Sequence, residues 1–160
     1  MLLEHLGRGD GVPRRRKNKY NARKVVFDNH EFDSVAEYEY FLILKNDKLV
    51  KDITLQPEYT ILAPYKVTCG RCDGRGRVYN QKTGNMNKCT LCKGYGTREK
   101  QGAKYTADFK VTYIDGHEEI IDVKGGVVSS DFPLRRKLFE IQTGKELVIA
   151  KKTKQGWKVK

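Results

Sequence analysis

Apolar and polar residues alternate along residues 105–113, and this pattern predicts a β-strand with one apolar face and Asp108 on the other. A second strand is predicted over residues 120–124, an apolar stretch that carries Asp122 and Lys124. Alternate residues of a strand point to the same face, so this carboxylate and this ammonium group would project side by side. Charged side chains rarely occupy such strands without a partner or a metal ion. The pattern therefore singles out these three residues as candidates for chemistry.

The length of the loop between these strands decides which residues face one another. A three-residue loop over 114–116 would pair Tyr113 with His117 and place Asp108 directly opposite Asp122. Its last residue is a glycine, which three-residue hairpin loops favour because that position is left-handed. A two-residue loop would place Asp108 opposite an apolar residue, on the wrong face. We therefore expect the three-residue loop, and the hairpin then carries either a reactive cluster or a polar face that is only solvated.

A helix is predicted from Ser34 to Lys45, because Ser34 and Glu37 fit the S-x-x-E capping box with Ser34 as the N-cap. Apolar residues follow Glu37 at +3, +4 and +7, so Glu37 would share the inward face of the helix. Two roles are open for Glu37: a cap alone, or an acid that also belongs to the reactive cluster. Glu39 is the other candidate acid, because apolar residues also follow it at +3 and +4.

Turn signals and apolar runs predict further strands and one more helix. They are a hairpin over 24–32 that turns at Asp28 and Asn29, strands over 53–57 and 59–62, a helix over 129–142, a strand over 146–150 and a last strand through Trp157. Helices interleaved with strands predict an α/β fold in which helices flank a mixed sheet. Residues 66–101 interrupt this order and are predicted to be an insertion.

The insertion contains two copies of the pattern C-x-x-C-x-G-x-G, at residues 69–76 and 89–96. Each C-x-x-C supplies two thiolates to one tetrahedral ion, and the glycines let the backbone turn sharply around the sulfurs. Disulfide bonds and redox chemistry are the alternatives, but the paired spacing favours a metal. We predict one structural Zn²⁺ per chain in a zinc ribbon, bound by Cys69, Cys72, Cys89 and Cys92.

The two repeats also resemble the zinc-binding region of the DnaJ co-chaperones. That region normally has four such repeats and binds two ions, whereas the two repeats here are enough for one. The chain has no His-Pro-Asp motif of a J domain. The resemblance is therefore confined to the zinc ribbon.

Composition favours a polyanionic partner. The 160 residues include 32 Lys and Arg against 20 Asp and Glu, which gives a net charge of +12 and a pI near 9.5. No amphipathic basic helix and no apolar run of about 20 residues indicates a membrane role. The start of the chain is too short and unflanked to be a signal peptide, so we expect a cytoplasmic protein, where thiolates can hold zinc.

An acid on a helix, followed by one strand with an aspartate and another with D-x-K, resembles the PD-(D/E)XK nuclease signature. More closely, the chain resembles a family of small bacteriophage endonucleases related to resolvases of four-way (Holliday) junctions. The match covers roughly residues 18 to 150 apart from the insertion, and Asp122 stands where many relatives have glutamate, an allowed variant. The segments that carry it are Phe32–Glu37, Leu55–Pro57, Tyr105–Phe109, Asp122–Gly125 and Arg136–Glu140.

The resemblance implies a restriction-endonuclease-like sheet and hydrolysis of phosphodiesters with one or two Mg²⁺ or Mn²⁺ ions. Hard oxygen ligands suit these ions, and Lys124 would orient the attacking water or stabilise developing charge. Gln56 is either a supporting residue near the metals or a polar residue of an edge strand. The expected metal ligands are Glu37, Asp108, Asp122 and the backbone carbonyl of Val123.

The resemblance also implies branched DNA as the substrate, cut by a homodimer in phage recombination, replication or DNA processing. We expect a flexible basic arm over 1–19 and a nuclease domain over 20–160, with the zinc ribbon at 66–101 inside it. A non-catalytic zinc-ribbon nucleic-acid-binding protein and a restriction-like or homing nuclease are the alternatives, and the ribbon could instead be a brace or a dimer contact. The expected DNA contacts are Arg14, Arg15, Arg16, Lys17, Arg71, Arg75, Arg77, Arg135, Arg136 and Lys137.

Overall fold

A computed structural model describes residues 24–27 and 29–160 of the chain. The basic arm over 1–19, with its predicted DNA contacts from Arg14 to Lys17, lies outside the described residues, and so does Asp28 of the first turn. The elements are β1 (Val25–Phe27), β2 (His30–Phe32), α1 (Val35–Asn46), β3 (Val50–Leu55), β4 (Glu58–Leu62), β5 (Tyr65–Thr68), β6 (Arg77–Tyr79), β7 (Met86–Lys88), β8 (Thr97–Lys100), β9 (Ala103–Thr106), β10 (Phe109–Tyr113), β11 (Glu118–Lys124), α2 (Phe132–Thr143), β12 (Leu147–Thr153) and β13 (Gly156–Val159).

A five-stranded mixed sheet forms the centre of the molecule, in the order β13-β12-β11-β10-β3. The pair β11–β12 is parallel and its other pairs are antiparallel. Ile121 of β11 packs in the same core as Phe41 of α1, whereas the preceding Ile120 packs with Phe139 of α2. Neighbouring residues of a strand point to opposite faces. The two helices therefore cover opposite faces of the sheet, which confirms the predicted mixed α/β arrangement.

The hairpin of β10 and β11 has the register predicted from its three-residue loop. Phe109 pairs with Ile121, and Tyr113 N–H donates to the His117 carbonyl at 2.9 Å. Gly116, the last loop residue, has φ 89°, which a residue with a side chain rarely adopts. Asp108 thus lies one position before the pair Phe109–Ile121, next to Asp122 of the opposite strand.

The predicted single strand over 105–113 is wrong, because the chain changes partners within it. Residues up to Thr106 form β9, which pairs with β4, and β10 begins only at Phe109. Between them, Ala107 N–H donates to the Pro57 carbonyl at 3.1 Å. The apolar residues of this segment are consequently divided: Tyr105 packs on the side of α2, whereas Phe109 packs on the side of α1.

Several predicted boundaries move by a few residues. β3 starts at Val50 and ends at Leu55, before the predicted range of 53–57 ends. Helix α2 starts at Phe132 instead of residue 129, because Pro133 lies in its first turn and Asp131 is its N-cap. Strand β12 continues to Thr153 and pairs with β13, so the final strand through Trp157 is present.

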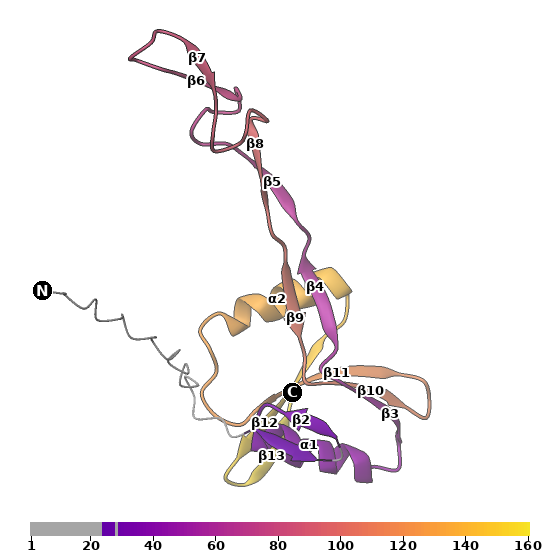
Figure 1. Ribbon diagram of the computed structural model, residues 1–160. Coiled ribbons are helices and arrows are strands. Elements are labelled where there is room, and N and C mark those ends of the chain that lie inside the picture. Colours follow the sequence, from indigo (N-terminus) through magenta and orange to yellow (C-terminus); the bar gives the residue numbers. More distant parts are fainter. Residues whose placement is uncertain (1–23, 28) are drawn as a thin grey trace, which may run out of the picture.

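The insertion projects from the sheet on a long two-stranded stalk (Figure 1). The ladder of β4 and β9 forms the part of the stalk beside α2, and the ladder of β5 and β8 continues it outward. The hairpin of β6 and β7 lies at the far end. In the part of the chain that the structure describes, no helix has the length and apolar character needed to cross a membrane.

Candidate functional site

Asp108 and Asp122 lie side by side where β10 begins. Asp122 projects from β11 and is only 4% exposed, whereas Asp108 is half-buried. The Val123 N–H donates to Asp108 Oδ2 at 2.5 Å, and the Asp108 N–H donates to the Ile121 carbonyl at 3.1 Å. These backbone contacts fix the first carboxylate against the strand that carries the second.

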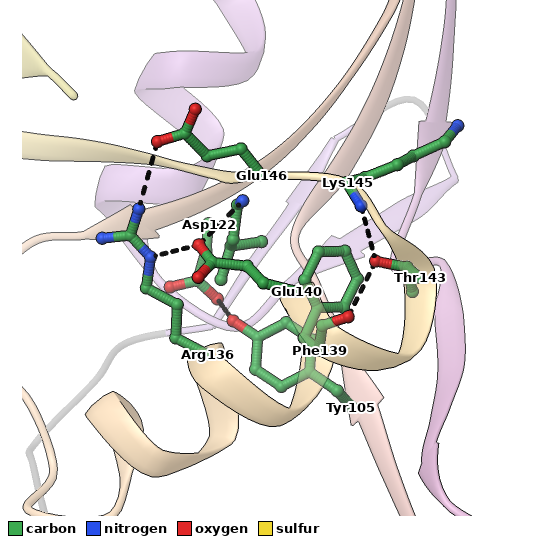
Figure 2. A network of polar contacts seen from close by, with 9 residues as sticks. Tyr105, Asp122, Arg136, Phe139, Glu140, Thr143, Lys145 and Glu146 are labelled. Carbon is green, nitrogen blue, oxygen red and sulfur yellow. Dashed lines mark hydrogen bonds and ion pairs between the residues drawn. The ribbon is translucent and has the colours of Figure 1, made fainter.

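Both oxygens of the Asp122 carboxylate have a neighbour. Tyr105 from β9 is 2% exposed and its hydroxyl donates to Asp122 Oδ1 at 2.8 Å (Figure 2). Lys124 Nζ forms an ion pair with Asp122 Oδ2, which confirms that residues 122 and 124 share a face. The same ammonium group lies 4.6 Å from the centre of the Phe132 ring of α2. A buried carboxylate is thus held in one orientation by a phenol and an ammonium group.

Tyr105 has a role that the sequence pattern did not predict. The pattern assigned it only to the apolar face of a strand, whereas in the structure it is the hydrogen-bond donor that orients Asp122. The available signal was chemical: a tyrosine that is fully buried usually finds a partner for its hydroxyl. Its ring also packs against Phe139, and the Arg135 guanidinium lies 5.2 Å from the ring centre.

Glu37 closes the capping box at the start of α1. Its N–H donates to Ser34 Oγ at 3.2 Å, Ser34 Oγ donates to Glu37 Oε1 at 2.7 Å, and Asp33 N–H donates to Glu37 Oε2 at 3.0 Å. The helix start lies against the end of β11, since a Cβ on Gly125 would come within 2.8 Å of the Ala36 Cβ. Glu37 is therefore a cap that also lies close enough to Asp108 for its charge to raise the pKa of that carboxyl group.

The other candidate acid of the helix is used elsewhere. Glu39 forms an ion pair with Lys152 of β12. Lys152 pairs with Trp157, and Trp157 packs against the core beneath α1. Glu39 thus holds α1 to that face of the sheet, away from Asp122.

Burial and the neighbouring acids raise the pKa of Asp108. Burial raises this pKa to about 8, and the negative charges of Asp122 and Glu37 contribute to the rise. The hydrogen bond from the Val123 N–H and the positive charge of Lys124 lower this pKa in part. Burial also raises the pKa of Glu37, although Ser34 and the Asp33 N–H oppose it. A carboxyl group raised in this way by burial and by neighbouring carboxylates is typical of sites that hold a cation. The oxygen donors fit a hard divalent ion.

The carboxylates are not gathered as tightly as a preformed metal cage. Among residues 24–27 and 29–160, the four cysteines are the group whose ligand atoms all lie within 4.8 Å of one another. Glu37, Asp108 and Asp122 do not reach that proximity. Capping contacts hold Glu37, and Lys124 and Tyr105 hold Asp122, so metal binding at this place would require these contacts to rearrange.

Removing the Asp108 charge should stabilise the metal-free protein at alkaline pH. A carboxyl group whose folded pKa is raised contributes stability below its unfolded pKa of about 4 and loses it as pH rises through about 8. In magnesium-free buffer we expect Asp108→Asn to raise the melting temperature by about 4 °C or more near pH 8 and by less near pH 5. Thermal unfolding followed by circular dichroism measures both values.

The matched control for this experiment is Asp52→Asn, which removes one charge from an exposed residue of β3. Its effect on the melting temperature should be small at both pH values. A stability gain for Asp108→Asn that does not depend on pH would contradict the electrostatic explanation.

Gln56 lies beside the acidic pair, at the end of β3. The strand pairs with β10, Leu55 opposite Phe109, and the Gln56 N–H donates to the Asp108 carbonyl at 2.9 Å. Gln56 has φ 48°, a left-handed conformation that costs a residue with a side chain on the order of 1 kcal/mol. The position next to Asp108 fits a supporting role for Gln56, and β3 is also an edge strand of the sheet, so both interpretations stay open.

The four cysteines form a site that fits one tetrahedral ion. Cys69 Sγ lies 3.9 Å from Cys89 Sγ, and Cys72 Sγ lies 3.7 Å from Cys92 Sγ. Zinc–sulfur bonds of about 2.3 Å in tetrahedral geometry separate the sulfurs by about 3.8 Å. The thiols are free and buried, so disulfide bonds are absent from the ribbon. The geometry supports the predicted structural zinc.

The repeated glycines let the two cysteine turns pack against each other. The Cys69 N–H donates to the Gly96 carbonyl and the Cys89 N–H donates to the Gly76 carbonyl, both at 2.8 Å. A Cβ on Gly76 would lie 2.3 Å from the Gly94 oxygen, and φ there is 71°. The two copies are thus related by an approximate two-fold arrangement, in which each closes the other.

The ribbon carries much of the positive charge. Residues 66–101 contain nine Lys or Arg against two Asp or Glu. Arg71, Arg75 and Arg77 are exposed, Arg71 donates to Thr90 Oγ1 at 2.9 Å, and Arg75 Nε donates to the Cys72 carbonyl at 3.0 Å. The role of these arginines in DNA binding stays a prediction.

The three basic residues of α2 that were predicted to contact DNA differ in their side-chain contacts and exposure. Arg136 contacts Glu140 Oε1 at 2.8 Å and Glu146 Oε1 at 3.6 Å (Figure 2), so two carboxylates already hold its guanidinium. Arg135 lies against the Tyr105 ring, and Lys137 is exposed. Of the three, Lys137 is the side chain most accessible to a phosphate.

Comparison with known proteins identifies a family. Residues 17–160 match the model of the family described as "Protein of unknown function (DUF1064)", and the chain belongs to this family. No curated protein and no solved structure matches the chain. The match includes both the acidic pair and the zinc ribbon. The comparisons offer no nuclease relative, so the resemblance to PD-(D/E)XK enzymes rests on the residues of the chain itself.

Proposed function

We propose that this protein is a metal-dependent DNA endonuclease with a restriction-endonuclease-like PD-(D/E)XK site. The observation that carries the proposal is the buried Asp122, which lies beside Asp108 and is paired with Lys124. A partly buried pair of neighbouring acids with an adjacent lysine is costly for stability. Cation-assisted catalysis explains that cost, and the basic surface of the chain suits a polyanionic substrate.

Glu37, Asp108, Asp122 and the Val123 carbonyl would hold Mg²⁺ or Mn²⁺, which supplies Lewis acidity and a water of lowered pKa when bound. Tyr105 keeps the Asp122 carboxylate in place through its 2.8 Å hydrogen bond. Lys124 would release its contact with Asp122 and donate hydrogen bonds to the attacking water or to the phosphate. Water oxygen would then bond to phosphorus as the bond to the leaving sugar oxygen breaks, while the water gives a proton to solvent and the sugar oxygen takes one from solvent.

The proposed substrate is branched DNA, and the proposed active form is a homodimer. A four-way junction has two scissile strands related by near two-fold symmetry, so a resolvase needs two sites with matching symmetry. The stalk places the basic ribbon far from the acidic pair (Figure 1). One chain could therefore contact one arm of a junction with the ribbon while its acids face another.

An assay of the purified protein on four-way junction, flap, linear duplex and single-stranded DNA tests this function. With Mg²⁺ or Mn²⁺ we expect paired nicks across the junction, made by a dimer in light scattering. Ca²⁺ should support binding without cutting, because its larger, looser shell positions water poorly. A monomer that cuts linear duplex as fast as junctions would remove the resolvase assignment, and absence of cutting on all four substrates would overturn the nuclease.

The alternative is a non-catalytic nucleic-acid-binding protein that uses the zinc ribbon. The loose arrangement of the carboxylates among the described residues and the excess of basic residues in the ribbon favour it. The same assay separates the two functions, since a binding protein would retain DNA in Mg²⁺ without cutting it.

A further inference from the structure

Three lysines form a row across neighbouring strands of the sheet. In the parallel pair β11–β12, Lys124 lies opposite Lys151, and in the antiparallel pair β12–β13, Lys151 lies opposite Lys158. Residues opposite one another in a ladder project from the same face, and neighbouring strands lie about 4.8 Å apart. The row therefore begins at the lysine that contacts Asp122 and runs outward to the edge strand β13.

The row lies on the same face as Asp122. Asp122 pairs with Ile149, which packs against the core that contains Phe139 of α2. By contrast, Lys152 points to the opposite face, where it pairs with Glu39 of α1. The alternation along β12 thus assigns Lys151 to the side of the sheet that carries the acidic pair.

A cleft of about 550 Å³ opens over this part of the sheet, next to the start of α2. Phe132 of α2, whose ring lies 4.6 Å from Lys124 Nζ, is one of its lining residues and joins the cleft to the acidic site. Apolar and cationic side chains line it together, among them Phe132, Ile149, Arg136, Lys151, Lys158 and Lys160.

The lysines of this cleft have no ion-pair partner among the residues that the structure describes. Over the range that the structure describes, no carboxylate forms an ion pair with Lys151, Lys158 or Lys160. Some lysines elsewhere are paired; Lys110 and Lys145, for example, share Glu118. Like charges opposite one another in a sheet repel. The neighbouring ammonium groups of Lys151, Lys158 and Lys160 are therefore complementary to a polyanion.

We propose that this lysine cleft binds the phosphodiester backbone of DNA, with Lys151, Lys158 and Lys160 contacting the phosphates that adjoin the scissile one. The assignment of the contacted phosphates rests on the proposed nuclease function, because Lys124 joins the row to the acidic pair. Arg136 is held by Glu140 and Glu146 and borders the cleft without being a free cation. None of the three lysines belongs to the basic segments that the sequence pattern selected.

The test measures DNA binding in magnesium-free buffer, where no cleavage occurs. A fluorescein-labelled four-way junction is titrated with the full-length protein and with the double variant Lys151→Gln/Lys158→Gln at several salt concentrations. We expect affinity near 100 mM salt to fall about tenfold or more. The slope of log K against log salt should shrink by about 1.8, because two phosphates are no longer neutralised by the protein.

The matched control is Lys48→Gln/Lys51→Gln, which removes the same charge beside and within β3, at the opposite edge of the sheet. It should change affinity less than threefold, and Lys151→Arg/Lys158→Arg should keep near-wild-type binding. Equal weakening in the glutamine variant and in the control would overturn the lysine cleft. If the wild type binds through the cleft but cuts nothing in Mg²⁺, the cleft stands as a DNA-binding site and the nuclease assignment falls.

Discussion

Asp122→Asn should abolish magnesium-dependent cleavage, with a loss on the order of a thousandfold or more, while DNA binding stays at or above the wild-type level. The asparagine is nearly isosteric and its oxygen can still accept the Tyr105 hydroxyl, so the orientation of the side chain is retained. The substitution removes the charge that would hold the cation. Affinity for DNA should not fall, because a negative charge near the phosphate is gone.

Cleavage rates on the preferred branched substrate and binding in Ca²⁺ measure this effect. Asp108→Asn should behave in the same way, Lys124→Ala should abolish cleavage while leaving binding nearly intact, and Asp52→Asn, an exposed acid of β3, should cut normally. An Asp122→Asn variant that cuts within about tenfold of the wild type would remove this residue from the site.

A matched pair of variants decides whether Glu37 or Glu39 is the acid that α1 contributes to the site. We expect Glu37→Gln to lose cleavage because Glu37 contributes to the charge around Asp108, whereas Glu39→Gln breaks only the ion pair with Lys152. A normal Glu37→Gln enzyme together with an inactive Glu39→Gln enzyme would reverse the choice of acid.

Local features of this site could be predicted from sequence because short-range geometry determines them. The glycine at 116 set the hairpin loop, and the loop set the register that brings Asp108 next to Asp122. The capping box placed Glu37 at the start of its helix for the same reason. The C-x-x-C repeats likewise contain their own turns, so the cysteine site follows from spacing alone.

The features that could not be predicted from sequence depend on distant partners. The segment 105–113 is divided because its first part pairs with β4 and its second part pairs with β3. The whole ribbon separates β4 from β9 in the sequence. The lysine row depends on the parallel pairing of β11 with β12, which no local pattern specifies. From the sequence alone, Lys151 and Lys158 are only two of several basic residues after residue 150. Their alignment in a row becomes visible once the strands are placed side by side.

Removal of zinc should unfold the ribbon and leave the sheet folded. The described core of the ribbon consists of Cys69, Cys72, Cys89 and Cys92, with Val78 as the partly buried hydrophobic residue against them. So small an apolar cluster cannot offset the conformational entropy of the segment, and the metal must supply most of its folding energy. The two cores around α1 and α2 contain no residue of the cysteine cluster.

We therefore expect about one zinc per chain in the purified protein and far less in Cys89→Ser, measured by metal analysis. Limited proteolysis should cut the variant within residues 66–101 and spare the rest, whereas Thr90→Ser, beside the same cysteine, should keep both zinc and resistance. A zinc-free wild type whose thiols are oxidised in pairs would overturn the metal site.

The same variant separates the two roles considered for the ribbon. If the arginines of the ribbon bind DNA, Cys89→Ser should weaken DNA binding. Turnover at saturating substrate should change little, because the acidic pair belongs to the sheet and its flanking elements. Exposed Arg71 and Arg77 are part of the element that unfolds, so both would release their phosphates together. The salt dependence of binding should fall by about 0.9 for each phosphate that the ribbon no longer neutralises. An unchanged affinity and slope, with a dimer that dissociates, would instead make the ribbon a contact between subunits.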